Sequence, residues 1–147
     1  MKVTDALLGE HGVFYAQFDH IETALWKESR PEVVRALAAL LAAGLAPHAR
    51  LEDELLFDPV AAEIGGSTGP MAVMRLEHDS IEKLLEEVAE ADGERGRHLL
   101  LEAIRLARAH FEKEERIAFP LVERVLGGEM LRALSAEWAS GRNVLVS

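Results

Sequence analysis

Hydrophobic positions recur every three or four residues over most of the chain, which is the period of an α-helix that packs on one face. In the first such segment, capped by Thr4 or Asp5 and running to about Lys27, the apolar stripe includes one histidine. Its positions are Leu7, His11, Phe14, Phe18, Ile21 and Leu25. A histidine in line with core residues is expected to be buried with them.

A second helix is predicted from Pro31, with Ser29 as its cap and Pro31 in its first turn. Pro47 removes one backbone hydrogen bond and predicts a kink near residues 43–46. Residues 58–69, DPVAAEIGGSTG, contain a proline and three glycines and predict a loop. The inward series of the second helix is Val34, Leu37, Leu41, Gly44 or Leu45, His48, Glu52 and Leu55.

The second half of the chain repeats this pattern. A third helix is predicted from Pro70 to Ala91, with the stripe Met71, Met74, His78, Ile81, Leu85 and Val88. A fourth is predicted from about Glu94 to Leu126, ending at Gly127 and Gly128 and bent near Pro120. Its predicted inner face is Leu99, Ala103, Leu106, His110, Glu114, Ile117 and Leu121, and a short fifth helix is predicted over 129–140.

The two halves, about 4–58 and 70–126, also resemble each other in sequence. LLGEHGVFYAQF resembles MRLEHDSIEKLL, and HARLEDELLF resembles HFEKEERIAF, so His11 corresponds to His78 and His48 to His110. Two helical hairpins related by a pseudo-twofold axis make one four-helix bundle. We therefore predict an all-α chain, a single domain over 1–147, folded as an up-down-up-down four-helix bundle with a short C-terminal helix.

The buried polar positions predict a metal site. His48 and Glu52 are four residues apart, as are His110 and Glu114, so each pair lies about 40° apart around its helix and about 6 Å along it. A lone core histidine usually donates to a carbonyl, and a lone His-x-x-x-Glu pair is a common helix-surface contact. Those simpler explanations fail jointly, because six such residues share inner faces and repeat in both halves. Burying them without partners would cost several kcal/mol each for the carboxylates.

A pair of cations would remove that penalty. Carboxylates can bridge two metals, and imidazole suits iron, zinc, copper and nickel. The six residues would give each ion about two histidines and two carboxylate oxygens, leaving room for a bridging oxo or hydroxo group and an open position for a small molecule.

Composition narrows the alternatives. The chain has no cysteine, which excludes disulfides, iron–sulfur clusters and thiolate sites, and its net charge of −10 argues against nucleic acid and anionic membranes. The N-terminus lacks the apolar region of a signal peptide, and the longest apolar stretch, Ala36–Pro47, is too short to span a bilayer. We expect a cytoplasmic protein, as a monomer or a homodimer.

His11, His48-x-x-x-Glu52, His78 and His110-x-x-x-Glu114 together resemble the pattern of the hemerythrin-like, or HHE cation-binding, family. The family's usual sequence is also matched by the Glu-His pairs at 10–11 and 77–78 and by the EERIAFP that follows the fourth histidine. The resemblance covers about residues 4–126. It implies a carboxylate-bridged non-haem di-iron centre, cycling between Fe2+ and Fe3+. By position, His11 and His48 would bind one iron, His78 and His110 the other, and Glu52 and Glu114 would bridge them.

The chain departs from the family's oxygen carriers at Met74, where those proteins resemble it but supply a further histidine. A thioether is a poor ligand for oxidised iron, which puts reversible oxygen carriage in doubt. Tyr15 and Glu82, each four residues after a ligand histidine, are candidates to complete the coordination or to hydrogen-bond to the centre. The neighbouring acidic residues Asp53, Glu54, Glu112 and Glu115 are expected to face solvent, and Phe57 and Phe119 to wall the site.

The leading hypothesis is a protein that binds or senses dioxygen, nitric oxide or peroxide. One alternative is a di-iron enzyme with peroxidase- or catalase-like activity, in which Tyr15 takes part in redox steps. Others are an iron-homeostasis protein, or a bundle whose centre holds zinc or manganese. A ferritin-type centre is disfavoured, because those bundles use Glu-x-x-His and this chain has the order His-x-x-x-Glu.

Overall fold

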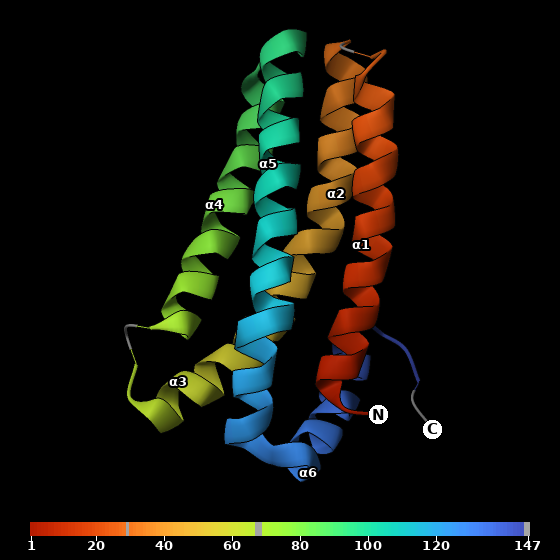
Figure 1. Ribbon diagram of the computed structural model, residues 1–147. Helices are drawn as coiled ribbons and strands as arrows, with labels where there is room; N and C mark the ends of the chain where they lie inside the picture. Colours follow the sequence, from red (N-terminus) through yellow and green to blue (C-terminus); the bar gives the residue numbers. More distant parts are fainter. Residues whose placement is uncertain (29, 67–68, 146–147) are drawn as a thin grey trace.

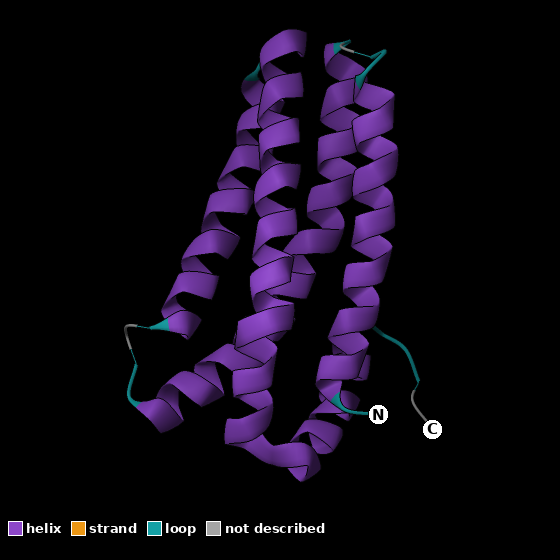
Figure 2. Cartoon of the chain, in the orientation of Figure 1, coloured by secondary structure: helices purple, strands orange, loops and turns teal. Residues whose placement is uncertain are grey.

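The computed structural model describes residues 1–28, 30–66 and 69–145, and within them the regular secondary structure is entirely helical (Figure 2). This confirms the predicted all-α bundle. Four helices of 21 to 23 residues make up the bundle: α1 (Val3–Leu25), α2 (Pro31–Glu52), α4 (Pro70–Glu90) and α5 (Gly93–Lys113). The other elements are α3 (Asp58–Ile64), α6 (Phe119–Gly141) and two π-helical segments, η1 (Asp53–Phe57) and η2 (Glu114–Ala118).

The four bundle helices run alongside one another as an up-down bundle, with α3 and α6 gathered at the end where both termini lie (Figure 1). Ser29, the predicted cap of the second helix, lies outside the described residues. Helix α1 begins earlier than predicted, at Val3, because the Asp5 carboxylate accepts a hydrogen bond from the backbone N–H of Lys2 at 2.9 Å. The Thr4 hydroxyl donates to Glu123 at 2.7 Å instead of capping α1.

The core consists of two apolar clusters separated by a polar layer. One cluster is built around Phe14, Phe18 and Leu100, and the other, at the end nearer the termini, around Leu56, Phe57 and Leu131. On α1, for example, the buried His11 lies between Leu7 of one cluster and Phe14 of the other. The buried polar layer comprises His11, His48, Glu52, His78, His110 and Glu114.

The π segments correct the predicted inner face of the fourth helix. A π turn carries one more residue than an α turn and so shifts the phase of everything after it. Ile117, predicted to face inward, is 58% exposed, and Ala118 and Val122 take the buried positions. A second difference lies before η2, in the regular part of α5. There Leu99 and Leu106 are only half-buried, and the neighbouring Leu100 and Ala107 pack in the core.

The connection between α2 and α4 also differs from the sequence prediction. Residues 58–64, predicted as loop, form α3, which has Pro59 in its first turn and ends at Gly65 in the left-handed conformation (φ 75°). Helix α2 continues through Pro47. Gly127 has φ 78° and ψ 156°, which no helix accommodates, and it divides α6 at the predicted helix end.

Helices α2, η1 and α3 form one 34-residue helical stretch, Pro31–Ile64. Its mean hydropathy of 1.3 over the most apolar window makes it long and apolar enough to cross a membrane, contrary to the estimate from the shorter run Ala36–Pro47. The core helix of a bundle passes the same test. Here the stretch contributes two of the buried polar residues, His48 and Glu52, which places them inside the bundle.

Candidate metal centre

The six side chains predicted as ligands meet inside the bundle. They come from α1, α2, α4, α5 and the first residue of η2, and each residue is exposed by 8% or less. Their donor atoms form two groups in which all atoms lie within 4.8 Å of one another. One group is His11, His48 and Glu52, and the other is Glu52, His78, His110 and Glu114.

Glu52 joins the two groups. Its Oε1 lies 2.9 Å from His48 Nε2 and 3.3 Å from His11 Nε2, and its Oε2 lies 3.2 Å from His78 Nε2. Oε1 therefore faces histidines of α1 and α2, and Oε2 faces a histidine of α4. Glu114 Oε1 lies 2.5 Å from His110 Nε2. Among the described residues Glu52 alone belongs to both groups, and Glu114 is grouped with His78 and His110.

These donor atoms are short of partners in spite of their proximity. Among the described residues, six buried side-chain atoms lack a hydrogen bond: His48 Nε2, His78 Nε2, His110 Nε2, Glu52 Oε2 and both oxygens of Glu114. His11 Nε2 and Glu52 Oε1 are hydrogen-bonded at 3.3 Å, but the other short distances to Glu52 and Glu114 lack the angles of hydrogen bonds. Unsatisfied buried polar atoms are rare and costly, and nitrogen and carboxylate oxygen are donors that divalent and trivalent metals accept. The residues fit a metal centre.

In each of the four histidines of the site, Nδ1, the ring nitrogen other than Nε2, contacts a carboxylate. A carboxylate at Nδ1 fixes the proton there, which leaves Nε2 free to bind a metal and orients the ring. Each of these carboxylates is the sequence neighbour of a proposed ligand on a different helix. The contacts are His11 with Glu115 at 3.0 Å, His48 with Glu10 at 2.6 Å, His78 with Asp53 at 3.2 Å and His110 with Glu77 at 2.9 Å.

Comparison with protein families decides the assignment. The family described as the hemerythrin HHE cation binding domain matches residues 2–122, most of the chain. The chain belongs to this hemerythrin family. Its domain binds metal cations, and the buried histidine and glutamate groups are suited to that role. No curated protein and no solved structure matches the chain.

Within this hemerythrin domain the carboxylates at Nδ1 obey the internal repeat. Glu10 and Glu77 correspond, as do Asp53 and Glu115, so both halves use the same pair of contacts. The expectation that Asp53 and Glu115 face solvent holds only in part. Their side chains are partly exposed, but each also contacts a histidine of a neighbouring helix from a π segment. Sequence reasoning missed the contacts of Glu10 and Glu77, although the Glu-His pairs that contain them were a visible signal.

The two additional candidates differ from each other. The Tyr15 hydroxyl donates to Glu115 Oε1 at 2.9 Å, and Glu115 in turn contacts His11, so Tyr15 acts on the centre through a carboxylate. Glu82 is exposed and has no partner among the described side chains. Met74 is buried in the apolar cluster nearer the termini.

Aromatic rings surround the histidines. Phe119 lies 5.6 Å from the His11 ring and Phe57 6.0 Å from the His78 ring, as expected for walls of the site. Phe111, which sequence reasoning did not single out, stacks on His11 at 3.9 Å between ring centroids and 5° between planes. These rings exclude water from the centre and strengthen its electrostatic interactions.

Burial and neighbouring charges shift the pKa values of four central residues. Burial raises the pKa of Glu114 to about 7, reinforced by the charge of Glu52. Burial also acts to raise the pKa of Glu52, but the charge of His48 and contacts from the surrounding histidines hold it well below its usual value. Burial opposes a charge on His48 and His78, yet the carboxylates around them raise their pKa values to about 9 and about 10. A bound cation would take the place of these protons.

Glu10 and Glu77, the outer carboxylates that contact Nδ1 of His48 and His110, have different partners in the two halves. Glu10 receives hydrogen bonds from Trp138 Nε1 at 2.8 Å and from Arg142 Nε at 2.7 Å, both on the C-terminal helix side of the molecule. Burial raises the pKa of Glu10, but these bonds and the one from His48 lower it to about 2. Its counterpart Glu77 pairs with the exposed Lys113. The His48 side of the centre is therefore tied to the end of α6.

We expect Arg142→Gln to weaken metal binding at the His11/His48 position by roughly tenfold, the low end of the 10- to 100-fold cost of outer-shell changes. The reason is that Glu10 loses both guanidinium hydrogen bonds of Arg142, keeps only the Trp138 bond on that side, and orients His48 less firmly. Competition with a chromophoric chelator measures the affinity. Arg132→Gln, on the exposed face of α6, is the matched control, and equal affinities in the two variants would contradict the link.

Proposed function

We propose that the chain carries a carboxylate-bridged non-haem di-iron centre that binds or senses dioxygen or a related small ligand, such as nitric oxide or peroxide. The observation that carries the proposal is the placement of Glu52, whose two oxygens face histidines of two different groups. A carboxylate in that position can bridge two ions, which a site for one ion would not require.

Iron bound there would supply a change of oxidation state and a coordination position for the ligand. The chain's own residues do the rest. The four histidines present Nε2 to the centre while their Nδ1 atoms are held by carboxylates, so the donor set needs no rearrangement when metal binds. Since Met74 packs in an apolar cluster, these six residues leave coordination positions open for a small molecule.

Metal analysis combined with a visible spectrum before and after oxygen exposure tests the proposal. We expect two iron ions per chain after anaerobic loading with ferrous iron, and a ligand-to-metal charge-transfer band that appears only after exposure to oxygen. Zinc or manganese uses the same donors, so the same protein purified from cells should be analysed for all three metals. A chain that retains zinc alone and takes up no iron would contradict the proposal.

Tyr15 supports a second candidate function, that of a peroxidase- or catalase-like enzyme. Its hydroxyl is bonded to Glu115, which is bonded to His11, and burial raises its pKa, so the phenol stays protonated. Glu115 is placed to accept that proton if the ring is oxidised. We expect the Tyr15→Phe substitution to lower peroxide turnover at least tenfold in an enzyme, and to leave small-ligand binding unchanged in a sensor. Stopped-flow assays of both quantities distinguish the two functions.

A further inference from the structure

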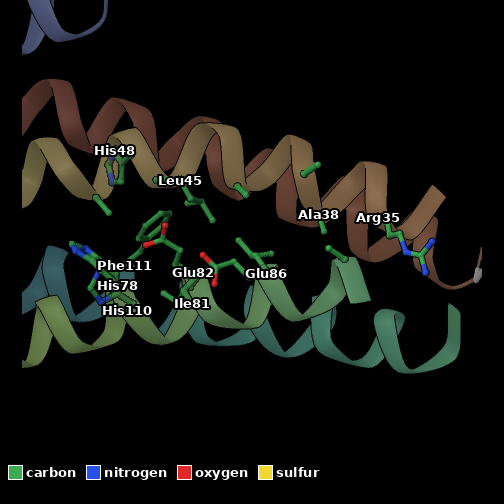
Figure 3. A pocket seen from close by; sticks show the side chains of 17 residues that line it. Arg35, Ala38, Leu45, His48, His78, Ile81, Glu82, Glu86, His110 and Phe111 are labelled. Carbon is green, nitrogen blue, oxygen red and sulfur yellow. The ribbon is translucent and has the colours of Figure 1, made fainter. Parts of the chain in front are cut away.

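A groove runs along the bundle from the candidate metal centre to the surface between α2 and α4. Its volume is about 290 Å³. His48, His78 and His110 lie at one end and Arg35 at the other (Figure 3). Counting 1.5 Å per residue, the wall that α4 contributes between His78 and Ala89 is about 16 Å long. The groove is elongated.

The walls of the groove are almost entirely apolar. Helix α2 contributes mainly alanines, which leave the space open, together with Leu45, and α4 and α5 contribute larger side chains near the histidines. The alanines of α2 are Ala38, Ala39, Ala42, Ala46 and Ala49, and the larger residues include Leu45, Ile81, Leu85 and Phe111. A groove of this kind suits a methylene chain, which gains from leaving water and needs no hydrogen bonds.

The size of the groove exceeds what a diatomic ligand needs. One water molecule takes about 30 Å³ in the liquid, so the groove has room for roughly ten molecules of that size. Small organic ligands bind in sites that begin at about 300 Å³. The groove is therefore matched to an organic molecule with an apolar body.

Two carboxylates set the charge of that molecule. Glu82 and Glu86 line the groove and reach into the space between α2 and α4 (Figure 3). They are one helical turn apart, and neither has an ion-pair or hydrogen-bond partner among the described residues. Arg35, at the far end, donates to the carbonyl of Ala91 at 2.9 Å and so is already engaged. An incoming cation would find two free acceptors.

The inner end of the groove opens onto the candidate metal centre. His48 and His110 are each 1% exposed, and their Nε2 atoms, like that of His78, have no hydrogen-bond partner in the described chain. All three line the groove. A molecule held by Glu82 and Glu86, about 6 and 12 Å along α4 from His78, would extend its other end to these nitrogens.

We propose that this groove binds an elongated aliphatic amine, with its ammonium group against Glu82 and Glu86 and its apolar end beside His48, His78 and His110. The proposal rests on the proposed function only in treating these histidines as metal ligands. An amine bound in this way would place its apolar end next to the small ligand that the metal ions bind.

Calorimetric titration of the full chain, iron-loaded and metal-free, with decylamine, decanol and decanoate tests the proposal. All three are used below the concentrations at which they form micelles. We expect decylamine to bind at least fivefold more tightly than the alcohol and the carboxylate, because ion pairs with the two exposed carboxylates Glu82 and Glu86 contribute about that factor. Equal affinities, tighter binding of decanoate, or no binding of decylamine would overturn the proposal.

Variants separate the groove from the rest of the surface. The double substitution Glu82→Gln with Glu86→Gln should lower decylamine affinity at least fivefold, and Ala42→Leu should lower it by filling the groove. Asp79→Asn with Glu90→Gln removes two exposed charges of α4 outside the groove and should change nothing. An equal loss in the two double variants would overturn the proposal.

Metal content, measured on the same samples, distinguishes failure of the two proposals. Selective decylamine binding by a chain that takes up no iron would support the groove and contradict the di-iron centre. Two irons per chain without decylamine binding would contradict the groove alone.

Discussion

Replacing Glu52 with alanine is expected to abolish metal binding at both positions of the centre. Glu52 is fully buried and is the one described residue shared by the two donor groups. Losing a direct ligand should cost more than the roughly 10- to 100-fold in affinity that outer-shell changes cost. Atomic absorption after dialysis gives the metal content, and we expect it to fall from two ions per chain to nearly none.

Glu114→Ala provides the informative comparison. Since Glu114 is grouped with His78 and His110 only, we expect this variant to lose metal mainly at that position and to retain about one ion per chain. Glu54→Ala, an exposed neighbour in η1, is the control and should retain both ions. Unchanged metal content in Glu52→Ala would remove the support for a bridging carboxylate.

Removing the metal is expected to lower the melting temperature by about 10 °C or more at neutral pH. An ion present at a thousand times its dissociation constant stabilises the folded state by about 4 kcal/mol per site. For a chain of this length, each kcal/mol corresponds to roughly 3 °C. Differential scanning calorimetry with and without a chelator measures the difference.

The size of this difference should depend on pH. In the metal-free chain the pKa values of His48 and His78 are raised from 6.5 to about 9 and about 10, and that of Glu114 from 4.5 to about 7. A raised pKa stabilises the fold below the unfolded value and this stability is lost as pH rises through the folded value. The lowered pKa of Glu52 acts in the opposite sense, stabilising above 4.5.

The metal-free chain should therefore be most stable near pH 4.5, where Glu52 is ionised and Glu114 is still protonated. It should lose stability as pH rises, first toward pH 7 as Glu114 ionises and then toward pH 9 to 10 as His48 and His78 lose their protons. Metal replaces the protons concerned, so the difference in melting temperature should widen over that range. Metal uptake at pH 7 to 8 should also release protons, which a pH indicator in weak buffer detects. A difference that narrows with rising pH, or uptake without proton release, would contradict the assignment of His48 and His78 as ligands.

The sequence pattern was sufficient for the four helices of the bundle and for the burial of the six central residues, but not for α3. Spacings of three and four residues place His11 and His78 on the same faces as Phe14 and Ile81, and the structure buries all of them. The phase of a stripe is reliable only while the helix stays regular, which is why Ile117 was placed on the wrong side.

The outer carboxylates were harder to predict for a different reason. Glu10 and Glu77 each contact a histidine of another helix, and such contacts depend on how helices pair and how far each is rotated. Periodicity along one helix contains neither quantity. The hydrogen bond from Arg142 to Glu10 was still harder to predict from the sequence, because it depends on the path of α6 after Gly127.

The two π segments bear on how this domain can be aligned and redesigned. Each inserts an extra residue next to a central glutamate, Glu52 or Glu114, and ends just before a proline, Pro59 or Pro120. Winding 114–118 as a regular α-helix, with no residue deleted, would rotate the following helix by about 100° relative to its present orientation. A designed version built on ideal heptads would thus put Ile117 back inside the bundle, carry Glu115 away from His11 and leave that imidazole without its acceptor.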